Sequence, residues 1–106
     1  LTQVASTIRG AVRAQDVVCR TGGDEFLVIC PDTSLQSALA CAERMRRAVE
    51  QTPVMLDAQR IKACMSAGVA VRDEAMPDVD ALIKRADEGV YIAKQQGRNR
   101  VASQQS

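Results

Sequence analysis

The chain contains no histidine and no tryptophan, and it has only one tyrosine and one phenylalanine. The absence of histidine argues against a zinc site and against histidine-based catalysis, because imidazole is a usual ligand in the first and the usual base in the second. The cysteines form no C-x-x-C pair and lie in apolar contexts, so we expect buried small hydrophobes in a reducing cytoplasm. A catalytic cysteine without a histidine partner is the less favoured alternative. The cysteines are Cys19, Cys30, Cys41 and Cys64.

Long apolar runs and a strong charge of either sign are also missing. No stretch is long enough to span a bilayer and the start shows no signal-peptide pattern, so we expect no membrane contact by this segment. The net charge of +1 is too small for a surface that binds a nucleic acid polymer. Lysine is scarce, because Lys62, Lys84 and Lys94 are the only lysines among 14 basic residues. Arginine binds planar edges and phosphates with paired donors, so this bias favours nucleotide recognition.

The residues that are present fit one compact α/β domain of 106 residues. Apolar residues recur at helical spacing over residues 1–14 and 35–51, and again in a last helix that Asp78 or Asp80 caps and that runs to residue 96. Short β-rich runs at 17–19 and 26–30 predict a hairpin, and those at 54–56 and 60–62 predict a second one. Residues 64–71 read as a strand buried on both faces, in which Gly68 indicates a bulge or a close backbone approach. Residues 99–101 read as a short final strand.

The tip of the first hairpin carries the most unusual pattern in the chain. Gly22 and Gly23 are followed directly by Asp24 and Glu25. Two carboxylates beside a backbone that a ligand can approach closely suit a hard cation that carries phosphate oxygens. A solvated acidic hairpin tip is the alternative that the spacing alone leaves open.

Six sequence blocks in fixed order, which together span nearly the whole chain, carry a resemblance to one family. The chain resembles the GGDEF family of diguanylate cyclases, and six blocks in register are far more specific than the five-residue motif alone. The blocks are R-x-x-D at 13–16, R-x-G-G-D-E-F at 20–26, A-E-R at 42–44, S-x-G-V at 66–69, A-D-x-x-V-Y-x-A-K at 86–94 and G-R-N at 97–99.

The resemblance implies a fold like the palm of nucleotide cyclases and polymerases, a sandwich of helices on a mixed, mostly antiparallel sheet. It implies a reaction that joins two GTP molecules into cyclic di-GMP and releases pyrophosphate, with each of two domains presenting one GTP. We therefore expect a bacterial cytoplasmic signalling protein that forms a homodimer and has a regulatory sensory domain upstream. The parent protein can still be membrane-anchored through another domain.

By the same resemblance, Asp24 is a ligand of Mg²⁺ (or Mn²⁺), and Glu25 is either a second ligand or a transition-state or structural contact. Gly22 and Gly23 let the substrate lie against the backbone. Lys94 and Arg98 bind the phosphates of GTP, and an ordinary basic helix end is the alternative for these two residues.

Arg13 and Asp16 match the family's R-x-x-D product-inhibition site, and Arg44 matches the arginine that completes this site from a neighbouring domain. An arginine can donate to the O6/N7 edge of guanine while a carboxylate accepts from its N1–H and N2–H groups. The alternatives are a helix-end ion pair between Arg13 and Asp16 and a solvated charge at Arg44.

The chain departs from the family at its start, because the family's first strand and helix are missing before Leu1. We expect residues 1–102 to be the C-terminal, larger part of a GGDEF domain and residues 103–106 to be a tail. The missing strand carries the other metal-binding aspartate, so we expect this chain alone to have little or no cyclase activity. The exposed sheet edge predicts a ligand-bridged or strand-exchanged oligomer. Two functions stay open, an active cyclase and a catalytically inactive module that binds cyclic di-GMP.

Overall fold

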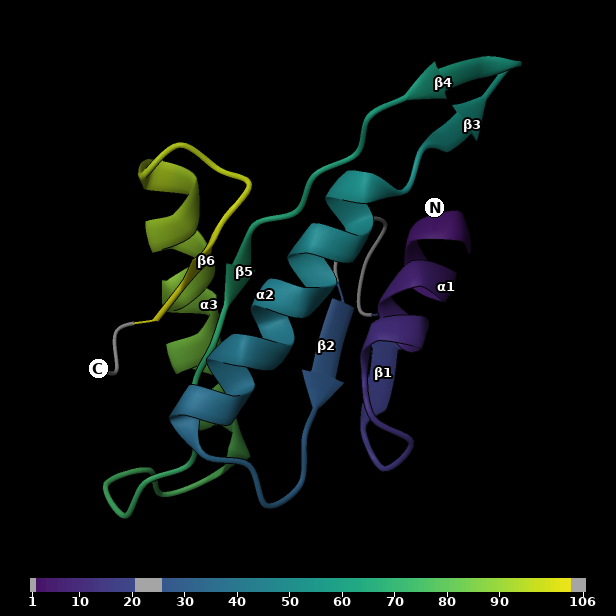
Figure 1. Ribbon diagram of the computed structural model, residues 1–106. Helices are drawn as coiled ribbons and strands as arrows, with labels where there is room; N and C mark the ends of the chain where they lie inside the picture. Colours follow the sequence, from purple (N-terminus) through teal and green to yellow (C-terminus); the bar gives the residue numbers. More distant parts are fainter. Residues whose placement is uncertain (1, 21–25, 104–106) are drawn as a thin grey trace.

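The computed structural model describes residues 2–20 and 26–103, which form three helices and three pairs of strands (Figure 1). The element order is the one that the sequence predicts. The elements are α1 (Thr2–Ala11), β1 (Val17–Arg20), β2 (Phe26–Ile29), α2 (Leu35–Gln51), β3 (Val54–Leu56), β4 (Gln59–Ile61), β5 (Ala67–Gly68), α3 (Val79–Gln95) and β6 (Val101–Ala102). None of the helices in the described ranges combines the length and the apolar character that a membrane span requires.

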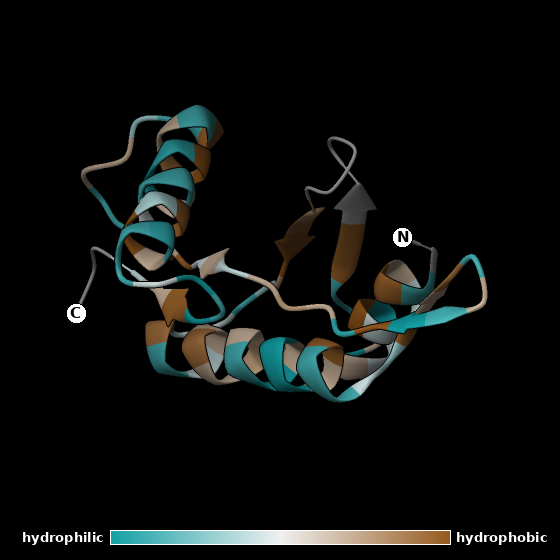
Figure 2. Ribbon diagram, turned by 90° about the horizontal axis from the view of Figure 1, so that it is seen from above, coloured by the Kyte–Doolittle hydropathy of each residue, from teal (hydrophilic) through white to brown (hydrophobic). Residues whose placement is uncertain are grey.

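The core lies between α1, α2 and the first hairpin, because each of these elements has one apolar face. Ile8 of α1 packs against Cys41, Met45 and Val49 of α2, and Val69 closes the cluster from beyond β5. Ser34 caps α2 by accepting a hydrogen bond from the amide of Ser37 at 3.2 Å, which satisfies one of the free donors of the first turn. Figure 2 shows the apolar colouring of the strands of the first hairpin. The predicted helix over residues 35–51 is confirmed.

Both predicted hairpins are present as antiparallel pairs. In the first, β1 and β2 pair in the register Val17↔Ile29 to Arg20↔Phe26. In the second, β3 and β4 are joined at Asp57 and Ala58, whose φ angles of 50° and 65° belong to the left-handed region that two-residue hairpin turns require. The second hairpin projects from the body of the molecule (Figure 1).

The parallel pair β5–β6 and helix α3 form the other half of the fold. Gly68 of β5 lies directly against α3, because a Cβ atom there would stand 1.9 Å from the carbonyl oxygen of Ala86 and 2.3 Å from the amide nitrogen of Val90. The close backbone approach predicted at Gly68 is therefore confirmed. Asp78 caps α3 through the amide of Ala81 at 2.9 Å. Gly97, with a φ of 119°, follows the end of the helix.

Several boundaries differ from the sequence prediction, by one residue at β1, β2, β4 and the end of α3 and by more at three other places. The first helix ends at Ala11 rather than at residue 14, because residues 13–16 form a separate turn. The strand expected over 64–71 pairs only at Ala67 and Gly68, since its partner β6 is itself two residues long. β6 begins at Val101, two residues later than the expected strand.

The described strands form three separate two-stranded sheets rather than one continuous sheet, although two of the three pairs are antiparallel, as the predicted fold requires.

Candidate functional site

Of the predicted site residues, Gly22, Gly23, Asp24 and Glu25 lie outside the described residues. The structure locates the strands that lead to them, since β1 ends at Arg20 and β2 begins at Phe26. The remaining candidates fall into two groups, one where α1 ends and one where α3 ends.

The first group is the turn between α1 and β1, where Arg13 and Asp16 face each other. Arg13 Nη2 stands 2.9 Å from Asp16 Oδ1, and the amide of Arg13 donates to Asp16 Oδ2 at 2.9 Å. The amide of Asp16 donates in turn to the carbonyl oxygen of Arg13 at 3.0 Å. The guanidinium also donates to Thr33 Oγ1 at 2.7 Å, which ties the turn to the segment before α2. The ion pair named as the alternative reading of R-x-x-D is therefore formed.

The two partners of this pair differ in their exposure to solvent. The side chain of Arg13 is 40% exposed, whereas that of Asp16 is fully covered. The hydrogen bond from Arg13 is the main reason that the pKa of the Asp16 carboxyl lies below its ordinary value, and the same bond raises the pKa of Arg13. Asp16 is thus ionised at neutral pH, and its oxygens are occupied by Arg13.

Arg44 reaches the same corner from α2. Its Nε donates to the carbonyl oxygen of Ala11, the last residue of α1, at 2.7 Å. This bond satisfies one of the carbonyl groups that a helix end leaves free. The side chain of Arg44 is exposed. The structure therefore brings the predicted Arg13, Asp16 and Arg44 together at one end of α1 within a single chain.

The second group lies at the end of α3. Lys94 is in the last turn and Arg98 follows Gly97, and both side chains are exposed. The amide of Arg98 donates to the carbonyl oxygen of Ala93 at 2.9 Å, and Arg98 itself has a φ of 65°. The chain therefore turns sharply at this point and places two basic residues at the helix end.

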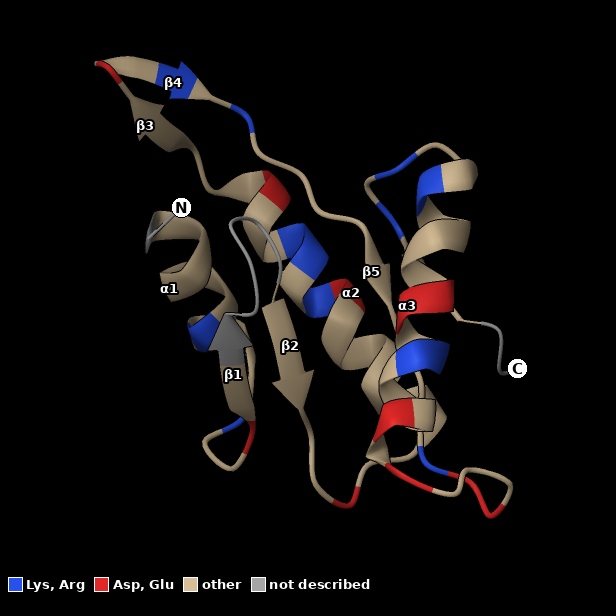
Figure 3. Cartoon of the chain, turned by 180° about the vertical axis from the view of Figure 1, so that it is seen from behind, with Lys and Arg blue, Asp and Glu red and all other residues tan. Residues whose placement is uncertain are grey.

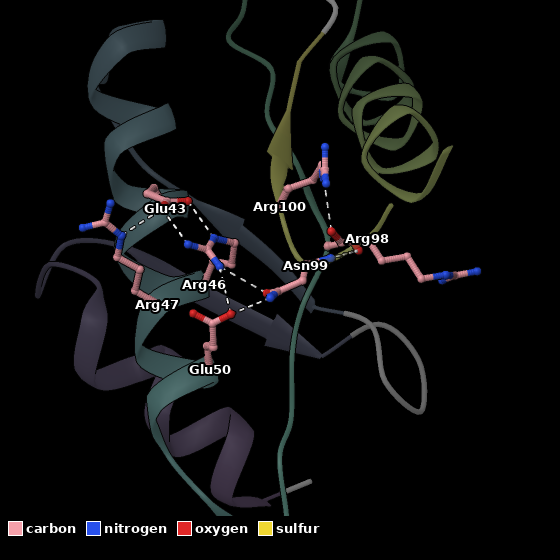
Figure 4. A network of polar contacts seen from close by, with 8 residues as sticks. Glu43, Arg46, Arg47, Glu50, Arg98, Asn99 and Arg100 are labelled. Carbon is pink, nitrogen blue, oxygen red and sulfur yellow. Dashed lines mark hydrogen bonds and ion pairs between the residues drawn. The ribbon is translucent and has the colours of Figure 1, made fainter. Parts of the chain in front are cut away.

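Sequence reasoning missed a polar network that joins this turn to α2 (Figure 4). Glu43 accepts from Arg46 at 2.7 Å and from Arg47 at 2.9 Å, and these bonds lower the pKa of Glu43 to about 2. Arg46 also donates to the side-chain oxygen of Asn99 at 3.2 Å, and Asn99 donates to Glu50. The i, i+3 and i, i+4 spacing of Glu43, Arg46 and Arg47 was a visible signal, whereas nothing in the sequence placed Asn99 beside α2. Figure 3 shows the acidic and basic positions side by side along α2.

Asp16, Cys30 and Cys41 form a cluster that the spacing of the cysteines did not predict. One carboxylate oxygen and the two sulfur atoms lie within 4.8 Å of one another. Burial, above all, and the neighbouring Asp16 and Cys41 raise the pKa of Cys30 to about 11, so its thiol is protonated at neutral pH. The predicted burial is confirmed for Cys41 and is wrong for Cys64, which is exposed, while Cys30 is half-buried.

Comparison with known proteins gives a family for this arrangement. Residues 1–100 match the family described as "Diguanylate cyclase, GGDEF domain". The chain is 39% identical over 101 residues to diguanylate cyclase A of Treponema denticola, covering 95% of this chain and 27% of that protein. It is 45% identical over 103 residues to the response regulator PleD of Caulobacter vibrioides, covering 95% and 23%. The chain therefore spans about a quarter of the length of these curated relatives.

Solved structures agree with this match. The GGDEF domain of YfiN (TpbB) from Pseudomonas aeruginosa superposes with a TM-score of 0.85 at 33% identity, covering 100% of this chain and 67% of that one. The GGDEF domain of DgcB from Caulobacter crescentus, solved in complex with c-di-GMP, gives a TM-score of 0.86 at 28% identity, covering 97% and 61%. The predicted fold class is confirmed by these structures.

Proposed function

Because the chain belongs to the GGDEF family of diguanylate cyclases, we propose that the protein carrying it joins two GTP molecules into cyclic di-GMP and that this segment also binds the product. The observation that carries the proposal is the family match over residues 1–100, which includes the intact Gly-Gly-Asp-Glu motif. The curated relatives named above include a diguanylate cyclase, which supports the same reaction class.

For the reaction we assign metal binding to Asp24 and Glu25, with Mg²⁺ or Mn²⁺ as the cation. Carboxylate oxygens are the ligands that these hard cations prefer, and the cation supplies neutralisation of phosphate charge when bound. Gly22 and Gly23 leave room for GTP beside the backbone. Lys94 and Arg98 bind its phosphates, Lys94 as a point charge and Arg98 as a forked donor. The exposure of both basic side chains at the end of α3 supports this role.

For product binding we assign Arg13, Asp16 and Arg44. Their convergence at the end of α1 supports the assignment, because two charged groups of the turn before β1 and one from α2 meet at one corner. Guanine recognition by Asp16 requires that carboxylate to exchange a bond from Arg13 for bonds from guanine N1–H and N2–H. Arg13 is then free to donate to the O6/N7 edge, so the ion pair is the resting state of the site and opens on binding.

Calorimetry with cyclic di-GMP tests the product site. We expect Arg13→Ala and Arg44→Ala each to weaken binding by about tenfold or more, since each removes a charge-assisted hydrogen bond. Arg9→Ala is the matched control, because Arg9 is an exposed arginine in the last turn of the same helix. Equal affinity of Arg13→Ala and wild type removes the product-site assignment.

A second candidate function is a module that binds cyclic di-GMP without catalysis. The observation that favours it is that the Arg13–Asp16 corner is built from α1, α2 and the turn before β1, without any residue of the hairpin tip. Production of cyclic di-GMP from GTP by the full-length protein, measured for wild type and Asp24→Asn, separates the two. Activity in wild type that Asp24→Asn abolishes supports the cyclase, and binding without activity in wild type supports the module.

A further inference from the structure

Asn99 is the one residue of the turn after α3 whose side chain reaches α2. Its Nδ2 donates to Glu50 Oε2, and its Oδ1 accepts from Arg46 Nη1 at 3.2 Å. Arg46 and Glu50 also approach each other at 3.5 Å, so the three side chains form a closed ring of contacts (Figure 4). The ring is partly shielded from solvent, because the side chain of Arg46 is 14% exposed and that of Glu50 is 31% exposed.

The backbone of this turn is held by hydrogen bonds at Asn99 and at Arg100. The amide of Asn99 donates to Ser66 Oγ at 3.2 Å, and the carbonyl oxygen of Arg100 accepts from the amide of Ala67 at 2.9 Å. Arg98 and Asn99 have φ angles of 65° and 47°, which lie in the left-handed region that residues other than glycine seldom adopt. Such a conformation persists only where the surroundings hold it.

The contacts hold the main chain of Arg98 while its side chain is exposed. Its amide is bonded to Ala93 and its carbonyl oxygen accepts from Arg100 Nε at 3.1 Å. The next residue, Asn99, is the one tied to α2. An asparagine suits this position for two reasons, because it tolerates left-handed backbone and because its amide donates to a carboxylate and accepts from a guanidinium at the same time.

We propose that Asn99 is a positioning residue, which through Glu50 and Arg46 fixes the turn that presents the Arg98 guanidinium to the phosphates of GTP. The inference rests on the proposed function of Arg98 and adds to it the parts of α2 that hold this arginine in place. A ligand group held rigidly loses less freedom on binding, so its contribution depends on the residues behind it.

The test exchanges the donor and the acceptor of the hydrogen bond between Asn99 and Glu50. N99D keeps the size of the side chain and its tolerance of left-handed backbone, but it places a second carboxylate against Glu50. In the double variant N99D/E50Q the amide and the carboxylate exchange sides, so the hydrogen bond is restored. In the full-length protein we expect N99D to raise the KM for GTP roughly tenfold, and N99D/E50Q to return it to within about twofold of wild type.

Two further variants, Glu50→Ala and Arg98→Ala, and binding measurements with cyclic di-GMP complete the test. Glu50→Ala removes the anchor on α2 without substituting any residue of the turn, and we expect it to act in the same direction as N99D. Affinity for cyclic di-GMP is expected to stay within about twofold in all of these variants, because the Arg13–Asp16 corner shares none of these contacts. A normal KM in N99D, or no recovery in the double variant, overturns the positioning role. If Arg98→Ala leaves GTP binding unchanged, the proposed function of this turn fails instead.

Discussion

The two arginine sites of this chain are held in opposite ways. At the corner between α1 and β1, the guanidinium of Arg13 is itself engaged, with Asp16 and Thr33 as its partners. At the turn after α3, the guanidinium of Arg98 is exposed, and its main chain is held by Ala93 and Arg100. At the first site the side chain of Arg13 is held in an ion pair, whereas at the second site only the backbone of Arg98 is held.

This difference predicts different costs of ligand binding. A ligand at the first site must replace existing bonds of Asp16, so its affinity is a difference between two sets of contacts. A ligand at the second site meets an arginine whose side chain makes no hydrogen bond to the residues that the structure describes, so the cost is the ordering of a long side chain. The first arrangement favours selectivity for a group that satisfies both partners, and the second favours binding of any suitably placed phosphate.

The largest expected effect on stability comes from disturbing the packing of α3, the helix that leads to Arg98, against β5. Gly68→Ala places a methyl group into backbone atoms of α3, at Ala86 and Val90, which cannot give way as a side chain can. We expect the variant to lose about 3 kcal/mol or more of unfolding free energy, or to fail to fold. Urea denaturation measures this loss.

The matched glycine variant lies beside the first site. Gly10 is exposed in α1, and a Cβ atom there meets nothing within 4 Å. Gly10→Ala is therefore expected to stabilise the protein by about 0.5–1 kcal/mol, because alanine is the better helix former. A stable Gly68→Ala protein would show that α3 can move away from β5.

An intermediate effect is expected from removing the two arginines in turn. Arg13→Ala leaves the covered carboxylate of Asp16 without its charged partner, so the variant should melt at a lower temperature than wild type. Arg98→Ala removes an exposed side chain and should change the unfolding free energy by no more than about 0.5 kcal/mol. Thermal melts of the two variants under the same conditions give the comparison. Equal melting temperatures would mean that the two arginines are held alike.

The smallest expected effect is on the acid dependence of stability. The pKa of Glu43 is lowered to about 2 from an ordinary value of 4.5, first by the hydrogen bond from Arg46. A lowered pKa in the folded state means that the contribution of Glu43 is complete above about pH 4.5 and is lost as the pH falls toward 2. Because Glu43 is partly exposed, solvent screening keeps this contribution small.

Denaturation between pH 7 and pH 2 measures the acid effect, and Glu43→Gln should flatten the curve below about pH 4.5. Asp16→Asn should act in the same direction, since the pKa of Asp16 is also lowered. A curve for Glu43→Gln that runs parallel to wild type would show that the α2 network adds no acid-sensitive stability.

Much of the fold follows from local patterns in the sequence. The stripe over 35–51 and the cap at Asp78 each depend on neighbours in the chain, and the structure has both. The close approach at Gly68 was predicted from the glycine alone, although its contacts lie in α3. The end of the first helix was misplaced because Ala14 suits a helix, while the bonds that stop it come from Asp16 and from Arg44, 33 residues beyond Ala11.

Contacts between distant segments explain what the sequence did not predict. The strand over 64–71 was overestimated because its apolar composition says nothing of the length of its partner. Asn99 was read as part of the G-R-N block and of a final strand, with no contact to α2, since its partners Arg46 and Glu50 lie 53 and 49 residues away. The cluster likewise joins distant segments, because Asp16 lies in the turn before β1, Cys30 follows β2 and Cys41 belongs to α2.

The projecting β3–β4 hairpin has a practical consequence. Its turn residues Asp57 and Ala58 are exposed, and a bond of 3.0 Å from the amide of Met55 to Gln3 Oε1 ties its base to α1. Exposed loop tips accept inserted residues, because a longer loop adds little closure entropy. The turn lies away from both the α1–β1 turn and the turn after α3 (Figure 1). It is therefore the natural attachment point for a fluorophore or an affinity tag that reports on either arginine site without entering it.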